Sequence, residues 1–319
     1  LKKYTSALNF RTLISVIISL IATWIAYKYQ LTYNLDLTII SVAVVFPIVF
    51  TYNLDPSTAG PGLIFETLPI AFGAMPVILP AMGSHGGATS EGQASVLASY
   101  GVDAQSLGIP IECSMETIAV ADSEWGTPVF WSRSASQLDG VLVLNRIKPH
   151  TDFKGGLGSG ILKMLVVGLG KREGASAFHR AAIQFGYENV LRQYASILID
   201  KMPVIGGLGI IENALHETDQ VAFVPVETAI EDEGRLLAKA KDLMPRLPFD
   251  DLDLLIVDRI GKDISGSGMD PNIVGRSVHG FSTDFSLQKD FPRIKRIMVR
   301  SLTPDSHGNA IGIGMADFT

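Results

Sequence analysis

Short apolar runs alternate with longer segments of mixed apolar and polar residues over most of this chain of 319 residues. Runs of this length are too short for typical globular helices and predict strands. The predicted strands lie near residues 76–80, 117–121, 140–145, 203–212, 252–257 and 295–301, and the predicted helices near 89–100, 160–170, 174–199 and 226–242. Strands that alternate with helices predict an α/β fold, with a largely parallel sheet flanked by helices.

A segment containing two prolines, residues 244–251, separates the last long predicted helix from the next strand. Prolines end the helix, and a new strand begins directly afterwards, as is typical of a linker. The chain is also long enough to form two hydrophobic cores. We therefore predict two domains, residues 55–246 and residues 247–319, with the active site in the cleft between them.

The first 54 residues differ in kind from the remainder. Residues 12–27 and 37–53 carry no charged side chain and are almost wholly apolar. Two such runs favour a transmembrane helical hairpin over residues 12–52, and a cleaved signal peptide would not continue into a second apolar run. We expect residues 1–54 to be this hairpin, foreign to the rest of the chain. Because the chain lacks an initial methionine and ends within a predicted element, we also expect it to be a fragment.

The composition of the chain limits the expected binding partners and the expected cellular compartment. The formal net charge is −6, without a basic stripe, so nucleic acid is not an expected partner. The single cysteine, Cys113, excludes an internal disulfide framework and a cysteine-rich zinc site. We expect the catalytic part to be cytoplasmic, and the protein to be membrane-associated if the N-terminal hairpin is genuine.

The densest group of candidate catalytic residues lies between residues 140 and 180. The apolar run at residues 141–144 predicts a strand buried on both faces, and His150 follows its carboxyl end, where catalytic groups of open α/β sheets collect. A glycine-rich loop that contains Gly158, Ser159 and Gly160 comes next. Its amides and the following helix could cradle a phosphate, but a tight loop-to-helix turn explains these glycines equally well.

Lys163 and His179 follow this loop, sixteen residues apart. Lys163 lies in an otherwise apolar segment, where a lysine either extends to solvent, loses its proton or enters a covalent bond. His179 is predicted in the first turns of the next helix. Upstream, His85 follows the predicted strand at 76–80, as His150 follows its own strand. Two histidines at equivalent strand ends favour a shared cleft.

These residues together resemble the nickel-pincer nucleotide-dependent lactate racemase family. The resemblance rests on the segment Met82-Gly-Ser-His85-Gly-Gly-Ala-Thr89, on Pro149-His150, on the glycine-rich loop and on Lys163 with His179, and it covers residues 60–319. It implies that Lys163 is joined through a thioamide to the nickel-pincer (pyridinium-3,5-bisthiocarboxylic acid) mononucleotide. Gly158, Ser159 and Gly160 would also contact this cofactor, and His179 would be the fourth nickel ligand.

The resemblance also implies an activity, an isomerase that racemises or epimerises 2-hydroxy acids by reversible hydride transfer. His85 and His150 would act as acid and base on opposite faces of the substrate, and an unperturbed imidazole titrates near the working pH. Lys262, after the predicted strand at 252–257, would contact the substrate. Cofactor maturation proteins and a small 2-hydroxy acid are the implied partners.

Two departures from the family pattern concern the substrate. Gly86 and Gly87 follow His85, where the lactate enzymes have arginine and proline. No arginine lies between Arg11 and Arg133, although the family has a carboxylate-binding arginine upstream of the first histidine. Another cation, such as Lys262 or Arg276, would then have to bind the carboxylate, or the substrate pocket would be damaged.

Two other functions stay open. His85, His150 and His179 could form a three-histidine zinc site of a hydrolase, because three histidines with an open position are a known catalytic zinc set. This alternative leaves Lys163 and the glycine-rich loop without a role. The chain could also be a membrane-anchored homologue without catalytic activity, given its N-terminal segment and the missing arginine.

Overall fold

The computed structural model describes residues 75–151, 155–276 and 291–319. The predicted transmembrane hairpin at 12–52 therefore lies outside the described residues. Within them, no helix is both long enough and apolar enough to cross a membrane.

The chain divides into two compact units, and neither is a single continuous stretch. The first unit takes its described residues from Leu1–Arg146, Gly160–Ile210 and Gln220–Glu233, and the second unit consists of Ile147–Ser159, Ile211–Asp219 and Gly234–Thr319. The division into residues 55–246 and 247–319 stays a prediction, as does a cleft between the domains.

Two small sheets lie mainly in the first unit, and the end of β4 and the start of β5 belong to the second unit. β1 (Thr117–Asp122) pairs with β2 (Pro128–Ser132) in antiparallel orientation. β3 (Val141–Arg146) pairs with β4 (Val204–Glu212) in parallel, and β5 (Thr218–Pro225) follows β4 as the third strand of that sheet. The connection from β4 to β5 is too short for a parallel pair. The α/β class is confirmed, but the sheets are small and only partly parallel.

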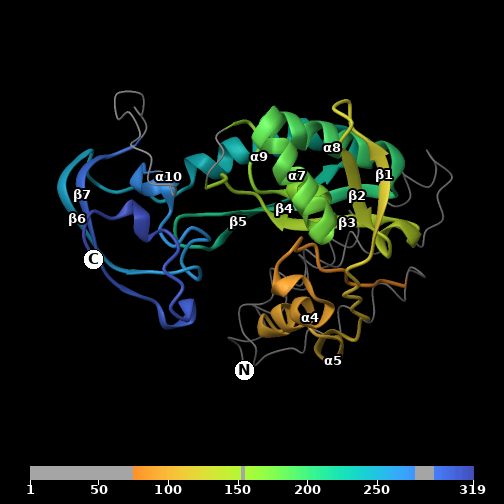
Figure 1. Ribbon diagram of the computed structural model, residues 1–319, viewed down its shortest axis with the longest axis horizontal. Coiled ribbons are helices and arrows are strands. Elements are labelled where there is room, and N and C mark those ends of the chain that lie inside the picture. The colour runs from red at the N-terminus through yellow and green to blue at the C-terminus, as the bar shows by residue number, and fades with distance from the viewer. Residues whose placement is uncertain (1–74, 152–154, 277–290) are drawn as a thin grey trace, which may run out of the picture. The chain divides into compact units, whose positions relative to one another are not determined.

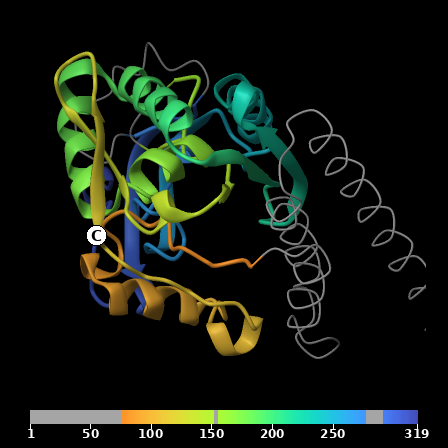
Figure 2. The same ribbon diagram turned by 90° about the vertical axis from the view of Figure 1, so that its right-hand side faces the viewer.

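The helices of this part of the chain are α4 (Ser90–Ser99), α5 (Ala104–Leu107), α6 (Ile161–Lys163), α7 (Lys171–Phe185), α8 (Tyr187–Lys201) and α9 (Ala229–Asp242), the last of which continues into the second unit. α7 and α8 pack side by side against the β1–β2 ribbon (Figure 1). α4 and α5 lie at one end of the first unit in both views (Figure 1, Figure 2). A single turn of π-helix, Met164–Gly168, links α6 to the loop before α7.

Aromatic side chains fill the core between these helices and the ribbon. Trp131 of β2 is fully buried, and its indole N–H donates to the carbonyl of Leu165, 3.1 Å away. The Phe178 ring of α7 meets Tyr187 and Tyr194 of α8 edge-on, at centroid distances of 5.4 and 6.1 Å. These contacts hold the π-helical turn and α7 in fixed positions, and both elements border the candidate site.

Two predicted elements differ from the structure. The predicted strand at 76–80 is reduced to a single bridge between Ile78 and Ile111, because Pro76 and Pro80 lack the N–H groups that would extend the pairing. The single predicted helix at 174–199 is two helices, α7 and α8, which are separated by Gly186. Gly186 has a φ of 84°, a backbone conformation that interrupts a helix and favours glycine.

The second unit is built on a parallel pair of strands, β6 (Asp251–Ile260) and β7 (Arg293–Leu302), with the short helix α10 (Pro271–Val274). Its core consists of Ile260, Met269, Val274, Ile294, Ile297, Val299 and Met315. Exposed ion pairs join the two strands, for example Lys295 with Asp253 at 2.6 Å. Such exposed pairs contribute little to stability, so the buried apolar residues hold this unit together.

Candidate functional site

Lys163 and His179 belong to the first unit and interact electrostatically. Lys163 is the last residue of α6 and is half-buried beside the buried Leu162 and Leu165. Burial lowers the pKa of His179, and the positive charge of Lys163 lowers it further. The two side chains are therefore close enough for one charge to act on the other. A histidine that stays neutral has a ring nitrogen free to bind a metal ion.

A π-helical turn lies between these two residues in the chain. It starts directly after Lys163, and α7 begins only three residues beyond its end, with His179 in the third turn of α7. Single π-turns occur frequently at functional sites. The sequence predicted the two residues but not this turn.

His85 lies in the first unit on an exposed loop before α4. Its backbone N–H donates to the Met82 carbonyl at 3.0 Å, and Gln93 donates to its carbonyl at 3.4 Å. The imidazole is exposed while the backbone is held, an arrangement suited to a group that exchanges protons with a bound substrate. Its acid/base role stays a prediction.

Glu233 is a buried carboxyl group beside α6 that the sequence did not single out. Its Oε2 accepts a hydrogen bond from the Leu162 N–H at 2.8 Å, and its Oε1 has no hydrogen-bond partner among the described residues. Burial raises the pKa of Glu233 to about 7, against the opposing effect of the Leu162 and Ile161 amides. Glu233 thus fixes the first turn of the helix that carries Lys163.

Glu233 also explains the glycine at position 160. A Cβ atom at Gly160 would lie 2.5 Å from Oε1 of Glu233, closer than van der Waals contact allows. The amide of Leu162, at the start of α6, already donates to this carboxyl group. The structure therefore gives Gly160 a reason that involves no phosphate. The assignment of Gly158, Ser159 and Gly160 to a cofactor stays a prediction.

Replacing Glu233 with glutamine is expected to change how stability depends on pH. Because the folded protein raises this pKa from 4.5 to about 7, the contribution of Glu233 to stability is fully present below about pH 4.5 and is lost as pH rises through 7. The loss amounts to ~3 kcal/mol, from 1.36 kcal/mol for each pKa unit. Urea unfolding at pH 5 and pH 8 should show this loss in the wild type and not in Glu233→Gln. Glu231→Gln, an exposed acid on the same helix, should behave as the wild type. Equal pH dependence in all three proteins would contradict the buried carboxyl group.

His150 belongs to the second unit and is half-buried in a loop that is tied at its base. Lys148 and Ser159 exchange two backbone hydrogen bonds, at 2.9 and 2.8 Å, and the His150 carbonyl accepts from the Asn272 side chain at 3.2 Å. A Cβ atom at Gly158 would lie 2.6 Å from the Lys148 carbonyl oxygen. Glycine at 158 is thus required by this close backbone approach beside Lys148.

The two cations proposed for the substrate carboxylate differ in their surroundings. Lys262 is exposed in the turn directly after β6, as the sequence predicted for its place at a strand end. The Arg276 guanidinium instead donates to the Met315 carbonyl at 2.8 Å, to Asp317 at 2.7 Å and to the Ile294 carbonyl at 3.1 Å. Arg276 therefore ties the C-terminal segment to β7, and the suggestion that it binds the carboxylate stays a prediction.

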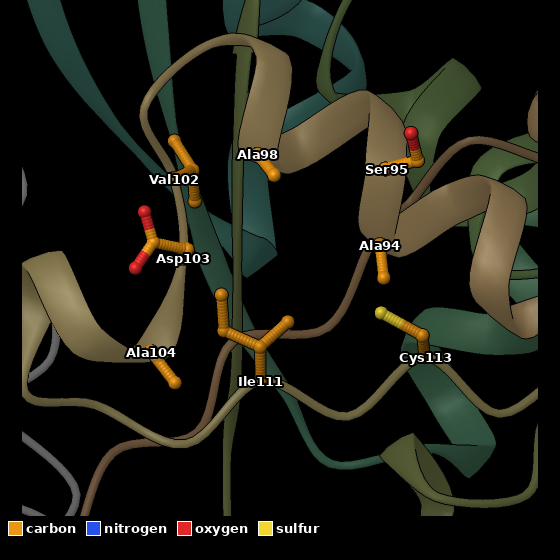
Figure 3. A pocket seen from close by; sticks show the side chains of 8 residues that line it. All are labelled: Ala94, Ser95, Ala98, Val102, Asp103, Ala104, Ile111 and Cys113. Atoms are coloured by element: carbon orange, nitrogen blue, oxygen red, sulfur yellow. The ribbon is translucent and has the colours of Figure 1, made fainter.

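A hollow of about 330 Å³ in the first unit contains none of the predicted site residues. Small and apolar side chains line it, together with Asp103, Ser95 and the thiol of Cys113, which points toward Ala94 (Figure 3). Burial raises the pKa of the Cys113 thiol, although Lys171 opposes this. A protonated thiol is a weak nucleophile, so this hollow has the chemistry of a packing defect more than that of a catalytic site.

No group of three or more His, Cys, Asp or Glu side chains that could hold a metal ion is found within residues 75–151, 155–276 and 291–319. Of the predicted residues, His85, Lys163 and His179 lie in the first unit, and His150 and Lys262 lie in the second unit. Within the first unit, the charge of Lys163 acts on His179.

Comparisons with known proteins give one structural similarity to report. Neither a protein-family model nor a curated protein matches the chain. Among solved structures, the chain is similar to the lactate racemase apoprotein from Thermoanaerobacterium thermosaccharolyticum, with 17% sequence identity and a TM-score of 0.49. The similarity covers 75% of this chain and 57% of that protein, so this chain spans less than two thirds of its length. At this level of similarity, function has to be inferred from the site residues.

Proposed function

We propose that the chain is a racemase or epimerase of 2-hydroxy acids that uses a nickel-pincer mononucleotide bound through Lys163 and His179. The observation that carries this proposal is the placement of Lys163 at the end of α6 and of His179 on α7 of the same compact unit, where the charge of Lys163 acts on His179. The resemblance in sequence independently pairs the same two residues as tether and nickel ligand.

The surroundings of these two residues fit the proposed cofactor. The half-buried Lys163 follows a helical turn fixed by Glu233, so its side chain starts from a defined position. The lowered pKa of His179 keeps its imidazole neutral, which is the form that binds metals. Imidazole suits nickel, as does the sulfur that the cofactor would add. When bound, the cofactor would supply the centre that accepts and returns a hydride.

Side chains of the protein would then transfer the hydroxyl proton and orient the substrate. One histidine removes the proton from the substrate hydroxyl as the C2 hydrogen leaves with its electron pair, and a planar 2-oxo acid results. Two such histidines, His85 and His150, are needed because the two enantiomers present their hydroxyl groups from opposite sides. The exposed ammonium of Lys262 is the proposed partner of the carboxylate, since Arg276 is engaged within its own unit.

Gly86 and Gly87 favour a substrate larger than lactate. Both have positive φ values, 65° and 66°, and no atom lies within 4 Å of the position that a Cβ atom at Gly87 would take. A Cβ atom at Gly86, by contrast, would lie 2.5 Å from the Gly92 backbone. Open space beside His85 thus comes from Gly87, and we propose that the substrate side chain occupies it.

The proposed reaction is tested with single-enantiomer 2-hydroxy acids of increasing size in deuterated water. The protein is produced together with cofactor maturation proteins, and products are resolved by chiral chromatography and mass spectrometry. We expect inversion without deuterium at C2, because the same hydride returns to the substrate. Gly87→Val should slow the larger substrates more than lactate, whereas Gly126→Val, at another positive φ in open space, should not discriminate between them. Deuterium at C2 would instead indicate a carbanion and would overturn the mechanism.

No observation favours the alternative of a three-histidine zinc hydrolase or that of a homologue without catalytic activity. The zinc alternative gives no role to Lys163, and Lys163 is the residue that acts on His179. The proposed partners are a 2-hydroxy acid and the proteins that build the cofactor.

A further inference from the structure

Gln93 is a buried amide that holds the loop of His85 from below. Its side chain, on α4, is 0% exposed. Its Nε2 donates to the Gly83 carbonyl at 3.0 Å and to the His85 carbonyl at 3.4 Å, and its Oε1 accepts from Lys171 Nζ at 3.4 Å. All the polar atoms of this amide are engaged, as a buried polar group requires. The loop of His85 is thus connected to α7 through one side chain.

Lys171 is a buried lysine that completes this connection. It is 1% exposed at the first position of α7, and its Nζ also donates to the Pro80 carbonyl at 2.8 Å. Its backbone φ is 54°, a conformation that favours glycine. Burial lowers the pKa of Lys171, while Cys113 and Glu112 oppose this effect. A lysine that is both buried and in an unfavourable backbone conformation indicates that its side-chain contacts matter.

The backbone of the loop is also packed against the turn before α7. The Gly83 N–H donates to the Gly168 carbonyl at 3.0 Å, and a Cβ atom at Gly83 would lie 3.1 Å from the Val167 carbonyl oxygen. The side of the loop that faces α4 is closed by the contact between Gly86 and Gly92. Hydrogen bonds to Gln93 and Lys171 therefore act on a loop that has little room to move. Its position is set relative to α7, which carries His179.

We propose that Gln93 and Lys171 are positioning residues. They hold the loop of His85 at a fixed position relative to α7, so that His85 can exchange a proton with the substrate. This inference rests on the proposed function of His85. Neither residue is proposed to touch the substrate. They act through the carbonyls of Pro80, Gly83 and His85.

The hold on the loop is tested first in the protein without cofactor, by hydrogen–deuterium exchange. Gln93→Glu keeps an acceptor for Lys171 but cannot donate to the two loop carbonyls. We expect the amides of residues 81–89 to exchange about tenfold faster in Gln93→Glu and in Lys171→Met, since exchange reports local opening. Exchange in α8 should not change. Gln105→Leu and Arg172→Met, which change exposed side chains nearby, serve as matched controls. Unchanged exchange at 81–89 in both test variants would overturn the proposal.

Turnover then shows whether this position matters for proton transfer. In cofactor-loaded protein, kcat should fall about 100-fold in Gln93→Glu, the cost of a displacement near 1 Å, with KM changed less than twofold. The Lys163 adduct and the nickel content should equal those of the wild type. A loss of adduct or nickel in parallel with kcat would indicate a general structural role and would contradict the proposal, as would an unchanged kcat.

Lys171→Gly tests whether a loss of kcat comes from the missing side chain or from a failure to fold. Glycine relieves the positive φ and removes the side chain, so stability should fall less than in Lys171→Met while kcat falls as far. A Lys171→Gly protein with wild-type kcat would overturn the role of the side chain. If the wild type itself carried no adduct and turned over no substrate, the proposed function would fail, and the exchange measurement would still decide whether Gln93 and Lys171 hold the loop.

Discussion

Lys163→Ala is expected to lose all turnover of 2-hydroxy acids, a fall of at least about a thousandfold in kcat/KM, because no other side chain is proposed to attach the cofactor. Lys163→Arg should fail equally, since a guanidinium keeps the charge but cannot form the thioamide. Lys201→Ala, a change at an exposed lysine at the end of α8, should retain wild-type turnover. Activity in Lys163→Arg would contradict covalent attachment of the cofactor and would indicate that only the positive charge at position 163 is needed.

In the protein without cofactor, the same variants test whether Lys163 and His179 interact with each other. Burial lowers the pKa of His179 and the charge of Lys163 lowers it further, so Lys163→Ala should raise that pKa part of the way toward its usual range and Lys163→Arg should leave it lowered. NMR titration of the histidine ring signals measures this directly. An unchanged His179 pKa in Lys163→Ala would show that the two side chains do not interact.

Alanine at His179 and alanine at the other two histidines are expected to have different effects. His179→Ala should lose bound nickel, because it removes the proposed protein ligand. His85→Ala and His150→Ala should keep nickel and lose about 10²–10⁴-fold in kcat, the usual contribution of a general acid or base. Nickel is measured by elemental analysis of each variant, and His216→Ala, at an exposed histidine in the turn between β4 and β5, is the control. Equal metal loss in all three variants would favour the three-histidine zinc site instead.

Local sequence features predicted most of the elements. Apolar runs identified β1, β3, β4, β6 and β7. The helix predicted near 89–100 is α4, which Thr89 caps by accepting from the Gly92 N–H at 3.0 Å. β2 and β5 were not predicted. The strand at 76–80 and the single helix at 174–199 were wrong where prolines and Gly186 outweigh an apolar pattern.

The residues around the candidate site were predictable only in part, because their roles depend on contacts between distant parts of the chain. Lys163 and His179 lie near each other in sequence and were found there. Glu233 meets Leu162 across 71 positions of sequence, and Lys171 meets Gln93 across 78. Neither residue could be recognised as buried from its sequence neighbours, because Glu233 is one glutamate on an amphipathic helix and Lys171 is one lysine after a glycine. Only the fold shows that both are in the interior.

Peptide mass analysis of the protein produced together with cofactor maturation proteins shows whether Lys163 carries the cofactor. We expect a peptide containing Lys163 whose mass is increased by the cofactor joined through a thioamide, with the modification assigned to Lys163 by fragmentation. The modification should be absent from Lys163→Arg and present in Lys201→Ala. An active, nickel-containing protein in which Lys163 is unmodified would show that the cofactor is not attached through this lysine.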